Sequence, residues 1–193
     1  MKFVSVELRC CSGAQWPGRA EKAEREDMAM HTYGEPIPGT REEKILKIEQ
    51  LPADLERSVA GLTDAQLDTR YRVGGWTVRQ VVHHLADSHI NAYTRVRLLL
   101  TEREPTIKPY DQDKWAALPD AHTLPVTVSL ALLHPLHVRL AAAFRNAQPE
   151  EWSRTVLHPE WGRLSLDHFL NEYAWHGHHH LEQISELKAS KQW

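Results

Sequence analysis

Hydrophobic residues recur with helical spacing in four long segments of this chain, and the clearest segment follows Trp76. Thr77 and Gln80 have the spacing of a capping box, in which two side chains satisfy the first free backbone N–H groups of a helix. Apolar residues then follow every three or four positions as far as about Glu102. These positions are Val78, Val81, Leu85, Ala92, Val96 and Leu99. The pattern predicts one long helix with a single buried face.

Two further segments predict helices that each contain a proline. The segment that begins at Thr40 places isoleucine and leucine at helical spacing, and Pro52 inside it predicts a kink or two shorter helices. A segment from about Thr127 to Arg145 has the same periodicity, with a kink expected at Pro135.

A fourth helix is predicted from about Ser165 to about Lys188. Four helices of roughly 20 to 26 residues, each about 30 to 39 Å long, are sufficient for a bundle. We therefore predict an all-α four-helix bundle. Residues 105–126 form a long irregular link between its second and third helices, with one turn expected around Trp115. The turn-like segment His158–Gly162 predicts a short β-hairpin before the last helix.

The first residues of the chain show no periodicity. We predict an N-terminal tail over residues 1–35 and one helical-bundle domain over residues 36–193. The tail contains the two cysteines of the chain, Cys10 and Cys11. Adjacent cysteines cannot cross-link a domain of this size, so we interpret them as an incidental pair in a reducing compartment.

The overall charge excludes several classes of partner. The chain has 193 residues, a formal net charge of −3 and a pI of about 6.5. It therefore lacks the basic surface expected of a protein that binds nucleic acid or an anionic membrane. No apolar run approaches the roughly 20 residues that span a bilayer, and the N-terminus lacks the apolar core of a secretory signal. We expect a cytoplasmic protein that acts on a small molecule.

Histidine is the unusual feature of the composition, with 13 in the chain. Four of them lie close together in the predicted last helix. On a helical wheel centred on Tyr173, His180 lies about 20° and His176 about 60° from the reference, whereas His178 and His179 point away. The buried stripe of this helix also contains Leu166, Phe169, Gly177, Ile184 and Leu187. Two histidines one turn apart therefore face the core.

Such a pair has two physical interpretations. Imidazoles at positions i and i+4 can bind one metal ion together, or both can be neutral core residues with hydrogen-bond partners of their own. A third ligand would favour the metal site. The second helix offers His84, at the edge of its apolar stripe, and His89, which faces the core, and periodicity leaves this choice open. His83 lies opposite the stripe and is expected to be solvated.

Three imidazoles would leave a position on the ion for water, as at a catalytic rather than a structural site. Asp87, His89 and Glu172 lie within two turns of the candidate ligands and could orient a ligand or relay a proton. For Asp87 and Glu172 taken singly, we favour the interpretation as ordinary residues at a helix boundary.

Two segments show a resemblance to a known family. Gly74–His89 (GGWTVRQVVHHLADSH) and Tyr173–His180 (YAWHGHHH) closely resemble the YfiT group of the DinB/YfiT-like metalloproteins, and the likeness covers about residues 36–190. The family pattern has one histidine eight residues after the motif tryptophan and two histidines four residues apart on the last helix. The resemblance therefore implies that the metal ligands are His84, His176 and His180.

The resemblance also implies a four-helix bundle that forms a homodimer, with one divalent ion per subunit. Zn²⁺ is the first choice of metal and Ni²⁺ the second. Members of the family are commonly named metal-dependent hydrolases, and related members use the metal to activate a low-molecular-weight thiol such as bacillithiol or mycothiol. Three hypotheses follow: a hydrolase that activates water, an S-transferase that activates a thiol at the same site, and a non-catalytic bundle stabilised by the metal.

Overall fold

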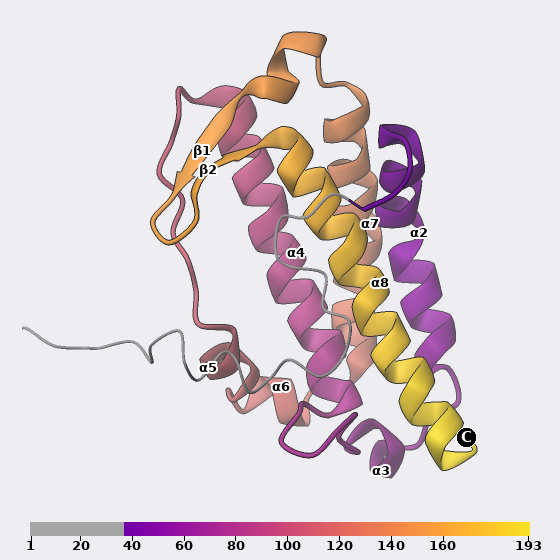
Figure 1. The fold of residues 1–193 in the computed structure, drawn as a ribbon. Helices are drawn as coiled ribbons and strands as arrows, with labels where there is room; N and C mark the ends of the chain where they lie inside the picture. Colours follow the sequence, from indigo (N-terminus) through magenta and orange to yellow (C-terminus); the bar gives the residue numbers. More distant parts are fainter. Residues whose placement is uncertain (1–36) are drawn as a thin grey trace, which may run out of the picture. The chain divides into compact units, whose positions relative to one another are not determined.

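Residues 37–193 are described by a computed structural model, in which four long helices form a bundle (Figure 1). The four are α2 (Arg41–Val59), α4 (Val78–Thr101), α7 (Val126–Arg145) and α8 (Leu166–Lys191). Helices α2 and α4 each pack against both α7 and α8, so α2 and α4 lie across the bundle from each other. The predicted all-α four-helix bundle is confirmed. The tail predicted for residues 1–35, with Cys10 and Cys11, lies outside the described residues.

Side-chain caps fix where the helices begin. The side chains of Thr40 and Thr77 each accept a hydrogen bond from the third helical N–H, and the side chains of Glu43 and Gln80 accept one from the backbone N–H of the cap residue. Both are capping boxes, which satisfy two backbone donors that a helix start leaves free. Ser165 caps α8 in the same way with its hydroxyl. The predicted starts of these helices therefore agree with the structure.

Helix α2 is continuous through Pro52, so the alternative of two shorter helices is wrong. Proline lacks an N–H, and the carbonyl four residues earlier, that of Ile48, loses its helical partner. His137 of α7 replaces it, because its Nδ1 donates a hydrogen bond to the Ile48 oxygen. A donor from a neighbouring helix thus satisfies the carbonyl that the proline leaves free.

The long link between α4 and α7 follows from the direction of these two helices. In Figure 1 both run upward, whereas α2 and α8 run downward. Neighbouring parallel helices need a connection that returns along their whole length, and residues 102–125 provide it. The link contains α5 (Gln112–Ala116), which agrees with the turn expected at Trp115.

Three short helices were not predicted: α3 (Asp64–Leu67), α6 (Asp120–Thr123) and the 3-10 helix η1 (Pro149–Ser153). Each has only four or five residues, and such a segment is too short to show a hydrophobic period.

The expected β-hairpin is present before α8. It consists of β1 (Thr155–His158) and β2 (Gly162–Ser165), which pair antiparallel. Gly162 has a φ of +76°, a conformation that glycine adopts without strain in a tight turn. The hairpin also holds the link, because Ile107 N–H donates to the Leu157 carbonyl at 3.0 Å.

Buried apolar residues form two clusters that meet in the middle of the bundle. One contains Phe144 and Phe169, and the other contains Leu55 and Ile184. A layer of histidine rings lies where the clusters meet along α4, α7 and α8. These residues are His84, His89, His137, His176 and His180. A polar layer inside an apolar core is costly unless its groups are satisfied, so these histidines are candidates for a functional site.

Helix α7 departs from the expectation that no segment is apolar enough to span a membrane. Among the described residues it is the one helix that is long and apolar enough to cross a membrane, with a mean hydropathy of 1.4 over an 18-residue window. It packs against both α2 and α4. The core helix of a helical bundle can be equally long and apolar. The place of α7 in the bundle therefore explains its apolar character.

Candidate metal centre

Three histidine rings from two helices meet in the polar layer. His84 lies on α4, and His176 and His180 lie one turn apart on α8. One ring nitrogen of each lies within 4.8 Å of the other two. The Nε2 atoms of His84 and His180 each lie 3.2 Å from the Nε2 atom of His176. The three residues implied by the resemblance are therefore close together, and their role as ligands stays a prediction.

The spacing of these nitrogens suits one tetrahedral ion. Nitrogen ligands about 2.0–2.1 Å from a tetrahedral Zn²⁺ lie about 3.3–3.4 Å from one another. His84 and His180 each lie 3.2 Å from His176 by this measure, and the ligand nitrogens of His84 and His180 lie within 4.8 Å of each other. The cluster therefore has the dimensions of a three-nitrogen metal site whose fourth position is left for another ligand.

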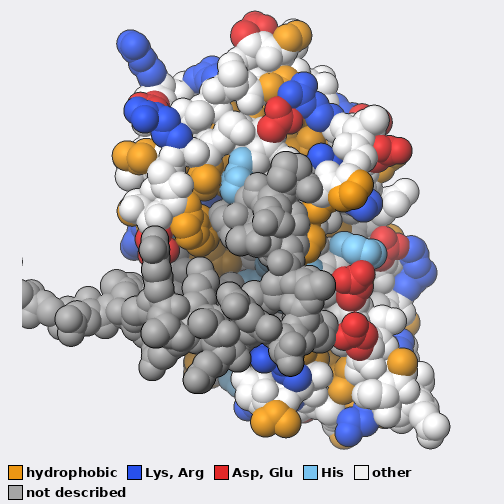
Figure 2. Space-filling model, in the orientation of Figure 1, with side chains coloured by type: hydrophobic (Ala, Val, Ile, Leu, Met, Phe, Trp, Pro, Cys, Tyr) orange, Lys and Arg blue, Asp and Glu red, His pale blue; other side chains and the backbone are white. Residues whose placement is uncertain are grey.

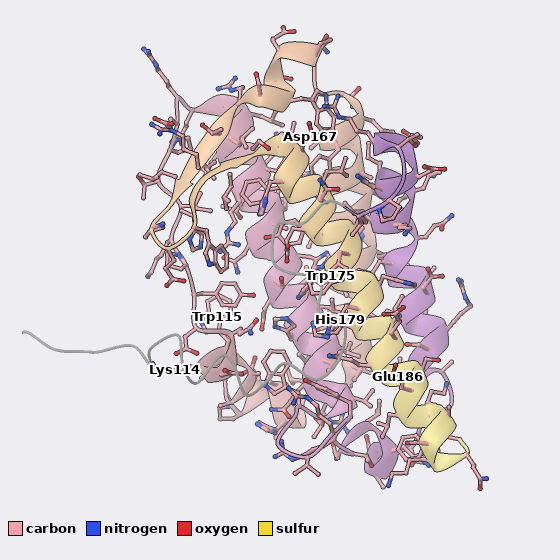
Figure 3. The ribbon with its side chains drawn as sticks, viewed as in Figure 1. Lys114, Trp115, Asp167, Trp175, His179 and Glu186 are labelled. Atoms are coloured by element: carbon pink, nitrogen blue, oxygen red, sulfur yellow. The ribbon has the colours of Figure 1, made fainter. Side chains whose placement is uncertain are left out.

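Gln183 determines which nitrogen of His180 carries the proton. The Gln183 amide nitrogen lies 2.8 Å from His179 Nε2, and its Oε1 lies 2.8 Å from His180 Nδ1. The amide thus donates to His179 and accepts from His180 Nδ1–H. His180 Nε2 then keeps its lone pair for a metal ion. Figure 3 shows His179 one turn beyond Trp175 on α8, and the two rings stack at 5.0 Å.

His89 lies behind His176 and has no part in the three-ring cluster. Its Nε2 atom is 3.3 Å from His176 Nδ1. A hydrogen bond donated by His176 Nδ1–H would leave the Nε2 atom of His176 free to bind a metal. The His89 ring is fully buried and stacks on His137, with centroids 4.7 Å apart. Of the two histidines that periodicity left open, His84 is the one in the three-ring cluster, and His89 lies beside His176 outside it.

Trp76 covers the cluster at the start of α4. Its ring centroid lies 4.5 Å from that of His84 and 6.4 Å from that of His180. The tryptophan just before the N-cap Thr77 lies about two turns from His84 along the chain, which brings the indole onto the imidazole. This contact gives a physical reason for the spacing of the motif.

Burial lowers the pKa of every ring in the cluster. The pKa values of His84 and His176 lie well below the usual 6.5, first because the rings are desolvated and then because neighbouring histidines repel a proton. Burial lowers the pKa of His180 to about 4. All three imidazoles are therefore neutral at pH 7, and the neutral form is the one that binds a metal ion.

The two acidic candidates are not part of the cluster. Asp87, one turn after His84, is half-buried, and its pKa is raised by burial and then by the charge of Asp120. Glu172, one turn before His176, is only 4% exposed. Within the described residues, the cluster of possible metal ligands consists of histidines alone.

His83 is buried, so the expectation that it is solvated is wrong. It is 7% exposed, its Nδ1 lies 2.7 Å from the Ser129 hydroxyl, and its Nε2 lies 3.2 Å from the Leu124 carbonyl. The cause is that α6 and the start of α7 cover α4 on that side. A helix buried on more than one side has no single apolar stripe by which to recognise its exposed face.

Sequence reasoning missed Gln183, Trp76 and His137 as neighbours of the site. Gln183 had a usable signal, because it lies three residues after His180 and so on the same face of the helix. His137 had none, since its position depends on a proline in a different helix.

Comparisons with known proteins identify similar sequences. The sequence profile described as the DinB superfamily matches residues 47–184. A protein of Oceanobacillus iheyensis named "Putative metal-dependent hydrolase" is 50% identical over 151 residues, which are 78% of this chain and 87% of that protein.

Solved structures show the same fold. YfiT from Bacillus subtilis, described as a probable metal-dependent hydrolase with an unusual four-helix bundle topology, matches with a TM-score of 0.79 and 44% identity over 82% of this chain and 94% of its own. A mycothiol-dependent maleylpyruvate isomerase matches with a TM-score of 0.61 and 18% identity, covering 76% of this chain and 61% of that chain. At 18% identity, the likeness to the isomerase shows a similar fold and nothing further.

Proposed function

Because this chain belongs to the DinB superfamily, we propose that it is a metal-dependent hydrolase in which His84, His176 and His180 hold one divalent ion. The proposal depends on one observation, the convergence of three Nε2 atoms in a buried layer. The names of relatives that share about half of their residues with this chain support it. Zn²⁺ suits three imidazoles in a tetrahedral site, and Ni²⁺ is the second choice because imidazole suits it as well.

When bound, the ion would lower the pKa of a coordinated water toward about 7 and polarise a substrate carbonyl. The side chains of the protein supply the geometry. Gln183 and His89 hold the ring protons away from the Nε2 atoms of His180 and His176. Trp76 excludes solvent from one side. Asp87 is the candidate proton acceptor, because its raised pKa brings the carboxylate closer to the working pH of a general base.

The substrate that fits this site is a small molecule. The net charge is −3, and on the face drawn in Figure 2 the coloured acidic and basic side chains are interspersed. A polyanion needs a continuous basic surface, which the coloured part of this face does not offer. The candidate ligands are also buried or half-buried among side chains rather than spread over a surface.

Activity of tag-free, Zn²⁺-loaded protein tests the proposal, because an affinity tag would bind metal itself. Hydrolysis of a panel of small esters and amides is measured with and without small thiols. His180→Ala should bind less than one tenth of the Zn²⁺ per chain and lose hydrolysis. His178→Ala is the matched control, since His178 is exposed on the same helix and should leave both unchanged.

The outcomes separate the three hypotheses. Hydrolysis without added thiol that requires His180 supports the proposed hydrolase. Turnover that depends strictly on a thiol would assign the same site to an S-transferase. One equivalent of bound Zn²⁺ with no turnover in either assay would leave the non-catalytic bundle.

A further inference from the structure

Helix α4 carries a buried cation that the metal centre does not use. Arg95 is 8% exposed, and residues 37–193 supply no carboxylate that forms an ion pair with it. The other buried arginine of the described residues, Arg79, is 5% exposed and pairs with two carboxylates, those of Asp64 and Asp68. A buried guanidinium without a counter-ion is costly, so Arg95 is retained at a cost that Arg79 does not carry.

The Nε–Nη2 edge of the Arg95 guanidinium, which is the edge that binds carboxylates side-on, is incompletely hydrogen-bonded. Its Nη1 donates to the Tyr173 hydroxyl at 3.2 Å. Its Nη2 makes only a long contact of 3.5 Å with the Lys108 carbonyl, and its Nε has no hydrogen-bond partner. The Nε and Nη2 donors point the same way and match the two oxygens of a carboxylate. This fork therefore has unused capacity for one planar anion.

Arg95 lies on the same face of α4 as the metal centre. It follows His84 by 11 residues, an offset of about 20° around the helix and about 16 Å along its axis. Helical side chains point toward the N-terminal end, so the guanidinium is directed back toward His84. Between them lies Ser88, which interacts with the Tyr110 hydroxyl of the link. The Tyr110 ring lies 5.9 Å from the Arg95 guanidinium carbon.

Tyr173 connects Arg95 to the other side of the centre. Besides accepting the hydrogen bond from Arg95, its ring lies 5.4 Å from the His89 ring and 6.5 Å from the His176 ring. Tyr173 therefore neighbours both the Arg95 guanidinium and the metal centre, and Tyr110 of the link lies beside the same guanidinium.

We propose that Arg95 binds the carboxylate of a small-molecule ligand whose reacting end lies at the three-histidine centre. The inference rests on the proposed function and adds a substrate class to it, a carboxylate-bearing small molecule. The ligand supplies Arg95 with the negative charge that Asp64 and Asp68 supply to Arg79. The link residues Lys108 and Tyr110 close over the bound carboxylate, because they already contact the guanidinium.

Two pairs of metal-seeking probes test this with Zn²⁺-loaded, full-length protein. The first compares 6-mercaptohexanoate with 6-mercaptohexanol, and the second compares suberic monohydroxamate with octanohydroxamate. Within a pair the metal-binding group is the same and the far end differs by its carboxylate. Binding is measured by calorimetry. A bidentate bond to a charged group predicts about 10- to 100-fold tighter binding of the acid in at least one pair.

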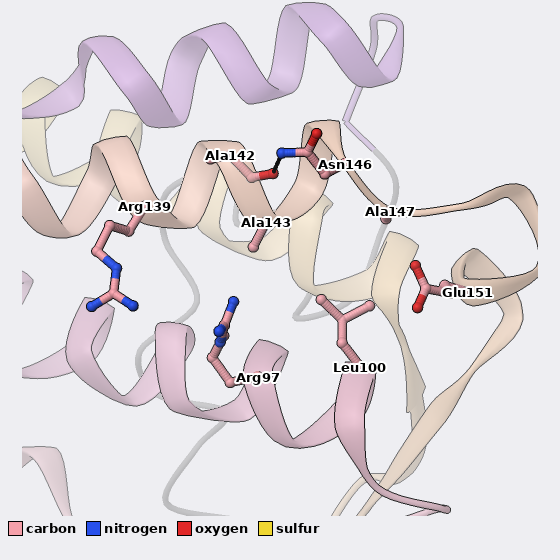
Figure 4. A pocket seen from close by; sticks show the side chains of 8 residues that line it. All are labelled: Arg97, Leu100, Arg139, Ala142, Ala143, Asn146, Ala147 and Glu151. Atoms are coloured by element: carbon pink, nitrogen blue, oxygen red, sulfur yellow. Dashed lines mark hydrogen bonds between the residues drawn. The ribbon is translucent and has the colours of Figure 1, made fainter.

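Variants of two arginines on α4 assign this preference to one side chain. Arg95→Gln and Arg95→Lys should reduce the acid preference to less than threefold, since neither residue offers the fork. Arg97→Gln is the matched control. Arg97 points into a separate cavity of about 300 Å³ between α4 and α7, shown in Figure 4 with Arg139 and Leu100. Arg97→Gln should keep the full preference.

A purely structural role of Arg95 would alter the binding of both members of a pair equally, so the ratio of their affinities is the decisive readout. If Arg95→Gln does not fold, Arg95→Lys retains the charge and carries the test. Tighter binding of 6-mercaptohexanoate than of 6-mercaptohexanol would indicate that the natural carboxylate ligand is a thiol. Tighter binding of suberic monohydroxamate than of octanohydroxamate would indicate that it is the hydrolysed substrate. Equal affinities of acid and neutral probe in both pairs, on protein that holds one Zn²⁺ per chain, would overturn the inference and leave the proposed function standing. Failure to bind Zn²⁺ at the three histidines would instead overturn the proposed function.

Discussion

His137 on α7 donates a hydrogen bond from Nδ1 to the carbonyl oxygen of Ile48 on α2, the carbonyl that Pro52 deprives of its helical partner. The same ring stacks on His89, whose Nε2 atom lies 3.3 Å from His176 Nδ1. A proline on one helix is thus connected, through two histidine rings, to a candidate metal ligand on another. The connection shows that the polar layer is built from backbone as well as side-chain groups.

Replacing His137 should destabilise the fold by removing this donor. His137→Ala leaves a buried carbonyl without a partner and creates a cavity, and together these cost about 2–4 kcal/mol. Urea unfolding in the presence of chelator measures the change without a contribution from bound metal. His134→Ala, an exposed residue of the same helix, should change stability by less than about 0.5 kcal/mol.

A double-mutant cycle with Pro52→Ala tests the cause. Alanine restores an N–H at position 52, which can donate to the Ile48 carbonyl within α2. His137→Ala should therefore cost clearly less in the Pro52→Ala background than in the native chain. Equal costs in both backgrounds would show that His137 stabilises the protein by packing alone.

The buried histidines make stability depend on pH. Burial lowers the pKa of His137 to about 4, whereas an unfolded histidine titrates near 6.5. Between these values the unfolded chain binds a proton that the folded chain does not, so stability is full above about pH 6.5 and is lost as the pH falls toward about 4. For His137 alone the loss amounts to about 3 kcal/mol.

Unfolding free energies measured with chelator from pH 8 to pH 4 check this window. His137→Gln should unfold with a shallower dependence on pH than the native chain, and His134→Gln should not. A pH dependence that is the same in all three proteins would mean that the pKa of His137 is the same in the folded and the unfolded chain.

How far the sequence predicts this structure depends on the range of each interaction. Thr77 and Gln80 act within one helical turn, so the start of α4 could be predicted from the local pattern. His180 could be placed on a buried face because periodicity within one helix decides it. The burial of His83 could not be predicted, since it depends on α6 and α7 returning over α4 after a long link. The resemblance, rather than periodicity, separated His84 from His89, and the expected dimer and cytoplasmic location stay predictions.

Gly177 of α8 should not tolerate a side chain. A Cβ atom at this position would lie 2.3 Å from Leu51 Cδ2 and 2.9 Å from Leu51 Cδ1. Leu51 is 3% exposed and has little room to move. Gly177→Ala gains about 1 kcal/mol of helix propensity but costs more through overpacking, so we expect a net loss of about 1–2 kcal/mol.

Thermal and urea unfolding of Gly177→Ala measure this loss. Leu51→Ala should be destabilising in the native chain, yet it should relieve the contact in the Gly177→Ala background. The double variant is therefore expected to be more stable than the sum of the two single changes implies. Simple additivity would contradict the close approach of α8 to α2 at this point.

Gln183 should contribute to metal affinity without touching the metal. It holds the proton of His180 on Nδ1, and loss of such a partner typically weakens metal binding about 10- to 100-fold. Gln183→Leu keeps the side-chain size and removes the acceptor. Competition with a fluorescent chelator measures the Zn²⁺ affinity, and Glu182→Gln, which changes an exposed neighbour, is the control. An unchanged affinity in Gln183→Leu would show that His180 is oriented by packing.

Bound metal should stabilise the folded chain through the three histidines. An ion that binds only the folded state adds about 2.7 kcal/mol when its free concentration is 100 times the dissociation constant. Excess chelator should therefore lower the melting temperature of the native chain by several degrees, because such a change corresponds to about 2–4 °C per kcal/mol at this chain length. His84→Ala should show no shift between Zn²⁺ and chelator, whereas His178→Ala should show the native shift. The loss of the shift in His84→Ala would show that His84 binds the ion together with His176 and His180, because these are the only candidate metal ligands grouped with His84 within the described residues. A native shift in His84→Ala would place the ion elsewhere and separate the histidine cluster from the metal dependence.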